Sequence, residues 1–432
     1  MADRCDVVVV GAGPSGLMAS WKLAEKGFKV ILLETKKTAY RYKRPCCAMV
    51  ILEPGFHSET VKTGPGKIMF ENTGLEIPYK GEFNNLNRSI KFSPSGYKFL
   101  VKSKTGYPLA RTISKEALLK TFYDKALEAG VEIREGESGI GAECRDESVE
   151  IRVRKEEKTY KINASYAVAA DGVNSAVLES LGLNKGRKFY FKTQVIAYHF
   201  EDVDCPYPDA FMDFRGTSFC ASSGGVWLTP KPNKSGKLEY EVSFAFDSSK
   251  GEKGKKLLDS FLARNYIKPW FKNARLTTVN GCVWTLRAPI KDSVFKRVLI
   301  AGDAGAFQEV ENQGAIMCGY RAAEAISLEN QGKNGFDGYR KFWINSFEFN
   351  DEKVLYDTAM GFGLRYLGDD ELDFIFSVFD NDELPGTINH FTVGKQMLAE
   401  IAKKMDFIKS KRPDIATKLV RFTSQKVEDY FK

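Results

Sequence analysis

The segment that most constrains the fold of this chain is residues 6–16, with the sequence DVVVVGAGPSG. Four consecutive valines are typical of a parallel strand that is buried on both faces. They lead into Gly11, Gly13 and Gly16 at GxGxxG spacing, which predicts a tight turn from the strand into a helix. The backbone can approach an anion closely at such a turn, and free N–H groups at the helix N-terminus face it. The segment therefore predicts a pyrophosphate site.

An acidic residue follows where such a site needs one. A second apolar run, 29–33, ends in Glu34, roughly 20 residues after the last glycine. A carboxylate at this position can accept hydrogen bonds from a ribose diol. The order of strand, glycines, helix, strand and acid predicts a dinucleotide site for either NAD or FAD. A glycine-rich turn in an ordinary βαβ unit is the alternative.

The composition is that of a globular protein with more than one structural unit. At 432 residues the chain is too long for one small core, and about two or three units are expected. Its 43% hydrophobic and 28% charged residues are typical of a soluble protein. No apolar run reaches the roughly 18 to 20 residues that span a bilayer, and no cationic and apolar leader precedes the first strand. We therefore expect a cytoplasmic protein.

The net charge gives little information about partners. A formal charge of +8 is modest for this length, and it comes from lysine-rich segments such as 250–256 and 403–412. Such segments are usually solvated faces, and weak attraction to an anionic membrane surface is the alternative. No nucleic-acid-binding motif accompanies them. We expect no nucleic-acid partner and leave peripheral membrane contact open.

The cysteines and histidines do not predict a metal site. The eight cysteines are scattered without a paired CxxC framework, and the three histidines have no metal-ligand spacing. Reduced thiols in a reducing compartment are therefore expected. The adjacent pair Cys46 and Cys47 is the one exception that suggests a specific role.

The first half of the chain combines a β-rich insertion with further α/β elements. Gly, Pro and Asn alternate with short apolar runs up to about residue 104, which predicts an inserted β-rich layer. A helix is predicted to open at Arg111, with Ser114 as its N-cap, and to end at Gly130. Further strands are predicted at 131–134, 149–154, 159–162 and 166–170.

The second half changes pattern twice. Aromatic residues in alternating patterns between 186 and 286 predict a second, mostly antiparallel sheet, with one helix at 255–266. A buried strand is then predicted at 298–301, followed by a helix at 313–330. Beyond residue 335 the pattern is helical.

Two of the predicted buried strands end in an acid beside small residues. The strand 166–170 leads into Asp171-Gly172, and the strand 298–301 leads into Gly302-Asp303. Ligands of an open parallel sheet bind at the carboxyl ends of its strands, so both pairs are expected along one crevice with the glycine turn. Taken alone, Asp303 could be a helix N-cap and Asp171 a turn residue. Together the segments predict one elongated cofactor site.

This set of segments resembles the FAD-dependent oxidoreductases of the para-hydroxybenzoate hydroxylase fold. In that superfamily the pair matched by Gly302-Asp303 contacts the ribityl and pyrophosphate region. The pair matched by Asp171-Gly172 lies close to the same cofactor, and the arginine matched by Arg111 contacts the flavin. The resemblance implies that the dinucleotide is FAD, held as a prosthetic group.

The resemblance also implies an architecture, an α/β fold with an α+β second domain. A Rossmann-like FAD-binding domain, an antiparallel-sheet substrate domain and a helical C-terminal region are expected. The boundaries implied are 1–60, 105–182 and 287–334 for the discontinuous FAD-binding domain, 61–104 and 183–286 for the β-rich substrate-binding domain, and 335–432 for the helical region.

Within this superfamily the chain resembles the geranylgeranyl reductase family, flavoenzymes that saturate isolated double bonds of polyprenyl chains. Segment 44–47, RPCC, resembles that family's PCG segment, whose cysteine sits beside the flavin ring. Segment 225–230, GVWLTP, resembles its YxWxFP substrate-pocket motif, and the tail with 411–414 is similar to its C-terminal region. The resemblance implies reduction of carbon–carbon double bonds in a hydrophobic substrate, a polyprenyl lipid of the geranylgeranyl type.

Four departures from that family concern the site. Gly225 and Thr229 stand where the motif has tyrosine and phenylalanine, and Cys47 replaces the glycine after the cysteine. Segment 307–314 reads FQEVENQG where the family has a proline and a glycine-rich approach to the flavin. The loss of two rings is expected to reshape the substrate pocket.

Cys46 is the expected catalytic group, because a thiol at the flavin face can donate a proton or tune the ring. Packing residues or redox-labile thiols are the alternative for Cys46 and Cys47. The expected FAD contacts are Gly11, Gly13, Pro14, Ser15, Gly16, Glu34, Thr35, Pro45, Cys46, Cys47, Arg111, Asp171, Gly172, Gly302, Asp303, Gly314, Ala315 and Ile316. The expected substrate contacts are Trp227, Phe211, Phe219 and Pro230, although aromatic residues on alternating strands are commonly core.

Two other functions share the same sequence features. A flavin-dependent monooxygenase of the aromatic hydroxylase type uses the same fold and cofactor motifs. A non-catalytic prenyl-binding protein is the other alternative, and the intact glycine turn argues against it. A flavin halogenase is disfavoured, because its WxWxIP segment and lysine have no counterpart here. The electron donor is left open among ferredoxin, NAD(P)H and a quinol.

Overall fold

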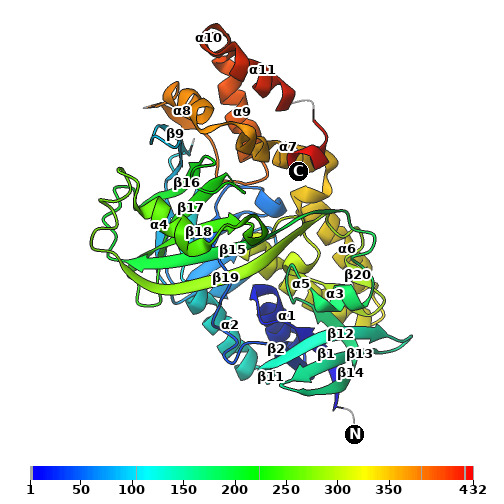
Figure 1. Cartoon of the computed structure of the whole chain (residues 1–432). Coiled ribbons are helices and arrows are strands. Elements are labelled where there is room, and N and C mark those ends of the chain that lie inside the picture. The colour runs from blue at the N-terminus through cyan, green and yellow to red at the C-terminus, as the bar shows by residue number, and fades with distance from the viewer. Residues whose placement is uncertain (1–2, 104, 223, 381, 423–424, 432) are drawn as a thin grey trace.

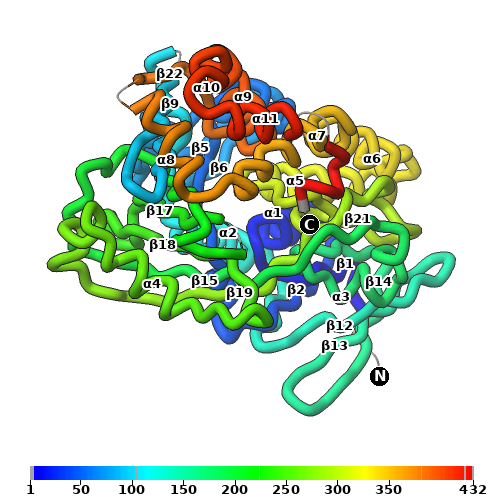
Figure 2. The backbone as a smooth tube through the Cα atoms, turned by 45° about the horizontal axis from the view of Figure 1, so that its top comes forward, coloured from blue at the N-terminus to red at the C-terminus, as the bar shows by residue number. Residues whose placement is uncertain are grey.

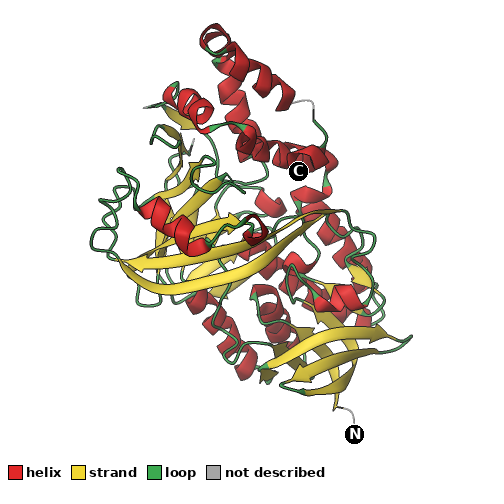
Figure 3. Cartoon of the chain, in the orientation of Figure 1, coloured by secondary structure: helices red, strands yellow, loops and turns green. Residues whose placement is uncertain are grey.

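The computed structural model describes residues 3–103, 105–222, 224–380, 382–422 and 425–431. Two β-sheets and a group of helices follow one another along the molecule (Figure 1). The N-terminus lies by the first sheet, the second sheet occupies the middle, and the C-terminal helices lie at the far end. Several helices lie between the two sheets (Figure 3).

The first sheet is built around the predicted N-terminal strand. Its order is β11-β2-β1-β14-β13-β12, and β14 also pairs with β21, which pairs with β20. The strands are β1 (Asp3–Val10), β2 (Val30–Glu34), β11 (Glu132–Glu135), β12 (Glu137–Cys144), β13 (Val149–Lys155), β14 (Lys158–Ala169), β20 (Val294–Phe295) and β21 (Val298–Ile300). The four valines of β1 are at most 3% exposed, as expected for a parallel strand covered on both faces.

One strand of this sheet differs from its prediction. The runs 159–162 and 166–170 belong to the single strand β14 rather than to two strands. Its first half pairs antiparallel with β13, and its second half pairs parallel with β1 and β21. The intervening residues continue the ladder, so the weaker apolar pattern there does not mark a break. Strand β12, which pairs with β13, was not predicted.

The helices α1 (Pro14–Glu25), α2 (Lys115–Glu128) and α5 (Glu311–Asn330) accompany this sheet. The side chain of Ser114 caps α2 by accepting a hydrogen bond from the Ala117 N–H, as predicted. The prediction that Arg111 opens this helix is wrong. Arg111 lies on β10 (Ala110–Ile113), because its backbone is held in register between β3 (Met49–Ile51) and β7 (Phe83–Leu86).

The second sheet is mostly antiparallel, as predicted, and has the order β19-β15-β18-β17-β16-β8-β9-β22. Its strands are β8 (Arg88–Phe92), β9 (Lys98–Lys102), β15 (Phe189–Glu201), β16 (Ala210–Arg215), β17 (Gly225–Pro232), β18 (Leu238–Phe246), β19 (Arg275–Arg287) and β22 (Glu383–Pro385). The pairs β16–β8 and β22–β9 are parallel. Helix α4 (Gly254–Leu262) packs on one face through Leu258 and Phe261.

Two small sheets lie beside these large ones. Strands β3 (Met49–Ile51), β10 and β7 (Phe83–Leu86) form one, and β4 (Val61–Gly64), β5 (Lys67–Phe70) and β6 (Leu75–Pro78) form the other. The first joins segments on both sides of the implied boundary at residue 60. The domain boundaries therefore stay a prediction.

The region after residue 335 is helical apart from β22. Its helices are α6 (Gly335–Ser346), α7 (Glu352–Gly361), α8 (Asp369–Ser377), α9 (Val393–Lys403), α10 (Met405–Lys411) and α11 (Pro413–Phe422). Helices α8 to α11 share a core with Phe99 and Val101 of β9, and Figure 2 shows α9 to α11 beside β9 and β22. Among the described residues, no helix is long and apolar enough to cross a membrane.

Helix α5 packs directly on the first turns of α1 at Gly319. A Cβ atom at this position would lie 2.2 Å from the Ser15 carbonyl oxygen and 2.9 Å from the Met18 Cβ. Such distances are too short for any residue larger than glycine without moving a helix. Gly319 therefore sets the distance between α5 and the turn that begins α1.

The substitution Gly319→Ala is expected to destabilise the protein by about 1–3 kcal/mol, because it overpacks this helix contact. Gly338→Ala is the matched control, because Gly338 is also in a helix but has nothing within 4 Å of the point where its Cβ would lie. The control should be neutral or stabilising by up to about 1 kcal/mol from helix propensity alone. Equal urea midpoints for both variants would contradict the overpacking of this contact.

Candidate cofactor site

An open cavity of about 390 Å³ lies at the carboxyl ends of β1, β2, β14 and β21. Ligands of parallel α/β sheets bind at this edge. The structure brings many of the predicted cofactor residues to its wall: Gly11, Gly13, Pro14, Ser15, Glu34, Thr35, Pro45, Cys46, Asp171, Gly172, Gly302, Asp303 and Ala315. Segments far apart in the sequence thus line one cavity.

The three glycines of the turn have the different environments that a pyrophosphate site requires. Gly11 has a φ of +99°, and a Cβ there would lie 2.5 Å from the Ala170 carbonyl oxygen. A Cβ at Gly16 would lie 1.8 Å from the Gly11 carbonyl oxygen, so Gly16 lets α1 pack on the turn. At Gly13 nothing lies within 4 Å of the Cβ position. The missing side chain leaves space for an anion beside the N-terminus of α1.

Glu34 is oriented at the end of β2 by backbone donors. Its Oε2 accepts a hydrogen bond of 2.8 Å from the Ala12 N–H, and its Oε1 accepts one of 2.8 Å from the Lys36 N–H. Each carboxylate oxygen keeps a further lone pair for another donor. This fixed carboxylate beside the glycine turn fits the hydroxyl groups of a ribose.

The two strand-end acids also stabilise the loops that follow them. Asp171 Oδ2 accepts a hydrogen bond from the Val177 N–H at 3.2 Å, and Asp303 Oδ1 accepts one from the Val310 N–H at 3.1 Å. Arg44 Nη1 lies 4.0 Å from Asp303 Oδ2 and 2.9 Å from the Cβ position of Gly172. Arg44 therefore lies beside both pairs, a position that its sequence context did not predict.

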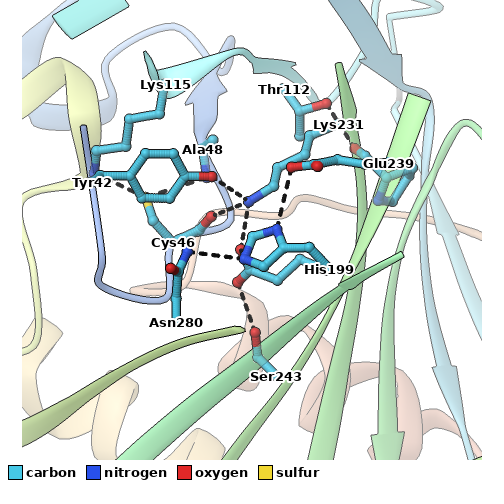
Figure 4. A network of polar contacts seen from close by, with 12 residues as sticks. Tyr42, Cys46, Ala48, Thr112, Lys115, His199, Lys231, Glu239, Ser243 and Asn280 are labelled. Atoms are coloured by element: carbon cyan, nitrogen blue, oxygen red, sulfur yellow. Dashed lines mark hydrogen bonds and ion pairs between the residues drawn. The ribbon is translucent and has the colours of Figure 1, made fainter. Parts of the chain in front are cut away.

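Cys46 lines the cavity from the segment 36–48 between β2 and β3, and Figure 4 shows it beside Lys115. The ammonium group of Lys115, the first residue of α2, donates a hydrogen bond of 3.1 Å to the Cys46 sulfur. Both residues line the cavity. Lys115 was missed in the sequence, because a single lysine after an N-cap is an ordinary helix residue.

Two glutamates from the segment 307–314, Glu309 and Glu311, line the same cavity. Burial raises the pKa of Glu311 well above its ordinary value, and the charge of Glu309 raises it further. Desolvation in the cavity and the negative charge of Asp303 raise the pKa of Glu309 to about 7. The residue nevertheless remains exposed to solvent. Burial lowers the pKa of His390, 3.7 Å from Glu311, to about 3, so a neutral imidazole faces Glu311. Its environment therefore favours the protonated, neutral form of Glu311.

Other predicted cofactor residues lie away from this wall. Arg111 donates hydrogen bonds of 2.7 Å to Asn85 Oδ1 and to Thr63 Oγ1, toward the small sheets. Gly314 lies inside α5, where a Cβ would meet His57 and Phe347, and Ile316 is 1% exposed in the core. Burial raises the pKa of the Cys47 thiol. For these residues the predicted contacts stay a prediction without support from the geometry.

The predicted substrate residues divide between two faces of the second sheet. On β17, Trp227 shares one face with Lys231, which contacts the segment 36–48. Phe211 packs against the core that includes the first sheet. Phe219 is 2% exposed in the separate core under α4, and the Pro230 carbonyl accepts a hydrogen bond from Thr112. Trp227 and Phe211 thus face the cofactor side, whereas Phe219 does not.

Two curated reductases are similar in sequence to most of this chain. Digeranylgeranylglycerophospholipid reductase from Methanocaldococcus jannaschii is 27% identical over 382 residues, covering 86% of this chain and 89% of that protein. The reductase of the same name from Methanococcus vannielii is 26% identical over 421 residues, covering 95% of this chain and 98% of its own length.

Solved structures share the fold. A geranylgeranyl bacteriochlorophyll reductase-like protein from Thermoplasma acidophilum superposes with a TM-score of 0.69 at 18% identity, covering 98% of this chain and all of that one. The p-nitrophenol 4-monooxygenase of Pseudomonas putida superposes with a TM-score of 0.59 at 16% identity, covering 93% and 98%. At these identities the likeness concerns the fold, which is of the para-hydroxybenzoate hydroxylase type.

The family described as "FAD binding domain" matches residues 4–306, which is well over half of the chain. The matched range begins in β1 and ends just after Asp303, so it contains the strand ends that meet at the cavity. The open space at Gly13 and the fixed carboxylate of Glu34 fit the phosphates and ribose of this cofactor. The chain therefore belongs to the FAD binding domain family and is an FAD-dependent oxidoreductase.

Proposed function

We propose that the protein reduces carbon–carbon double bonds in the polyprenyl chains of a lipid, in the manner of a digeranylgeranylglycerophospholipid reductase. The observation that carries this proposal is a set of groups that can transfer a proton in the wall of the FAD cavity. Cys46, Lys115 and Glu311 all line this cavity, and the charges of Cys46 and Lys115 both act on Glu311. The two curated relatives, aligned over most of the chain, support the choice of a polyprenyl lipid.

Saturating an isolated double bond requires a hydride on one carbon and a proton on the other. Reduced FAD supplies the hydride when it is bound. The residues of this chain hold the cofactor, exclude water and deliver the proton. In this proposal Gly13, the N-terminus of α1 and Glu34 hold the nucleotide end.

At the reactive end, the Cys46 thiol is the proposed proton donor. Lys115, hydrogen-bonded to its sulfur, is placed to return the proton afterwards. Glu311, whose raised pKa favours its protonated form, is proposed as a further donor that adds no negative charge to the cavity while it holds its proton. An isolated alkene offers no polar group, so Trp227 and Phe211 are proposed to position it by apolar contact.

The substrate class is tested by reducing the bound flavin with light in the absence of oxygen, which bypasses the unknown electron donor. Unsaturated glycerophospholipids with geranylgeranyl chains are then added, with saturated analogues as controls. We expect only the unsaturated lipid to reoxidise the flavin and to gain two hydrogens per double bond by mass spectrometry. Oxygen-dependent hydroxylation of an aromatic compound would instead identify a monooxygenase. Purified protein that cannot bind FAD would leave only prenyl binding.

The role of Cys46 is tested by Cys46→Ala. We expect the FAD content to be unchanged and the turnover with the lipid to fall by about 100-fold or more, the range for loss of a general acid. Cys144→Ala on β12, another partly buried cysteine, is the matched control and should keep full turnover. Unchanged turnover in Cys46→Ala would remove the thiol from the reaction.

The charge state of Glu311 is tested by the pH dependence of stability. A raised carboxyl pKa means that the folded state binds more protons than the unfolded state, so stability is lost as pH rises above the ordinary value of 4.5. The Glu311→Gln variant has no ionisable carboxyl group at this position, so it does not show this loss of stability with rising pH. We expect its melting temperature to rise relative to wild type as the pH increases from about 5 to about 8. Glu128→Gln, at an exposed residue of α2, controls for loss of a surface carboxylate. Parallel pH profiles of wild type and Glu311→Gln would contradict the raised pKa.

A further inference from the structure

A buried lysine lies directly behind the wall that carries Cys46. Lys231 is on β17 and is 1% exposed. Its ammonium group donates to the Cys46 carbonyl at 3.0 Å, to the Tyr42 hydroxyl at 3.1 Å and to the Glu241 carboxylate (Figure 4). An ammonium group has three protons, so every donor of Lys231 has an acceptor.

Two of these acceptors belong to the cavity wall, whereas Lys231 is not among the described residues that line it. Tyr42 and Cys46 lie in the segment 36–48, which has no helix or strand. Other contacts of this segment include the Gly281 N–H of β19, which donates to the Lys43 carbonyl at 3.1 Å, and Lys36, which donates to two carbonyls of the segment itself. The second sheet thus supplies external hydrogen bonds to a wall without regular structure.

The rest of the network keeps Lys231 charged and immobile. Glu241 lies on β18, is 1% exposed and also accepts a hydrogen bond of 2.7 Å from Ser243. His199 of β15 is 3.6 Å from Glu241 and 3.2 Å from Glu239. Burial acts to lower the pKa of Lys231, but the charge of Glu241 outweighs it and raises the pKa. The ammonium group of Lys231 on β17 is therefore bonded directly to Glu241 on β18, and through Glu241 it is linked to His199 on β15.

Cys46 is consequently held by two ammonium groups from two different parts of the fold. Lys115 of α2 donates to its sulfur, and Lys231 of β17 donates to its carbonyl. The first contact is on the cavity side, and the second comes from the sheet that carries Trp227. Each contact restrains a different atom of the same residue, so together they restrict both the position and the rotation of Cys46.

We propose that Lys231 is a positioning residue that fixes the Tyr42–Cys46 wall, and hence the Cys46 thiol, against the second sheet. Its effect on turnover rests on the proposed function, whereas its effect on the wall does not. A lysine with a purely structural role would stabilise the whole protein without a particular effect on the Tyr42–Cys46 wall. The two roles are therefore separable by a local measurement.

The test uses Lys231→Met, which keeps the aliphatic stem and removes the three donors. Lys231→Met/Glu241→Gln is the companion variant, because it leaves no unpaired charge if the single variant folds poorly. The matched control is Lys91→Met. Lys91 is a second buried lysine of the same sheet, 3.2 Å from Asp213, and Asp213 keeps a hydrogen bond of 2.8 Å from Arg215 without it.

Two readouts are taken on flavin-free protein. Trypsin nicking after Lys43, an exposed residue of the segment, reports opening of the wall, and mass spectrometry reports the alkylation rate of the Cys46 thiol. We expect both rates to rise on the order of tenfold in the two Lys231 variants, because proteolysis follows the population of the open form. Lys91→Met should leave both rates unchanged. In the FAD-loaded enzyme the same Lys231 variants should lose kcat with little change in KM.

Unchanged nicking and alkylation in the Lys231 variants would overturn the proposal. An equal rise in Lys91→Met would also overturn it, because the effect would then be general destabilisation. Because neither rate depends on a substrate, an altered wall in a protein that fails to reduce the lipid would refute the proposed function and leave the positioning role standing.

Discussion

The contact between α1 and α5 is the packing on which the cofactor site depends. Ser15 of α1 donates a hydrogen bond to the Ala315 carbonyl of α5, and Gly319 lets the two helices touch one turn further along. This contact places the glycine turn, which binds phosphates, beside the start of α5, where Glu311 and Asn312 line the cavity. A shift of either helix would separate the nucleotide end of the site from its reactive end. Residues 300 positions apart therefore form one site because α5 has no side chain at Gly319, where it packs on α1.

The segment 36–48 gains its order from residues outside it. Its backbone has no ladder of its own. Three of its carbonyl groups, those of Ala39, Arg41 and Cys46, accept hydrogen bonds from lysine ammonium groups, and others accept from backbone N–H groups of neighbouring elements. Burying a lysine is costly unless the charge is paired, and the carboxylate of Glu241 meets that condition for Lys231. The polar network on the second sheet thus supports the wall of a site that the first sheet forms. The two sheets depend on each other at this wall, although each has its own core.

The sequence predicted those parts of the site that follow from local backbone chemistry. The environments of the glycine turn and of the acid after it are as expected, for Gly11, Gly13, Gly16 and Glu34. A strand-to-helix turn that binds a phosphate allows few other backbone conformations or residue types. Lys115, Arg44 and Glu311 could not be predicted, because their roles come from long-range packing that places ordinary charged residues at one cavity. Arg111 was assigned from the superfamily resemblance, and Phe219 as one of the aromatic residues of the predicted second sheet. The pairing of β10 with β7 places Arg111 beside Asn85, and the turn between β16 and β17 places Phe219 in the core under α4.

The parallel pairing of β22 with β9 also bears on how the chain folds as it is made. Without β22, β9 would be the last strand of the second sheet, with one row of backbone groups unpaired. Its partner β22 is synthesised about 280 residues later. The Lys98 N–H, which donates a hydrogen bond to Asp380, also has no acceptor there until that part of the chain is made. An open strand edge during this interval is a template for association with other chains. The C-terminal region therefore covers the β9 edge only late in synthesis, a structural role separate from anything it contributes to catalysis.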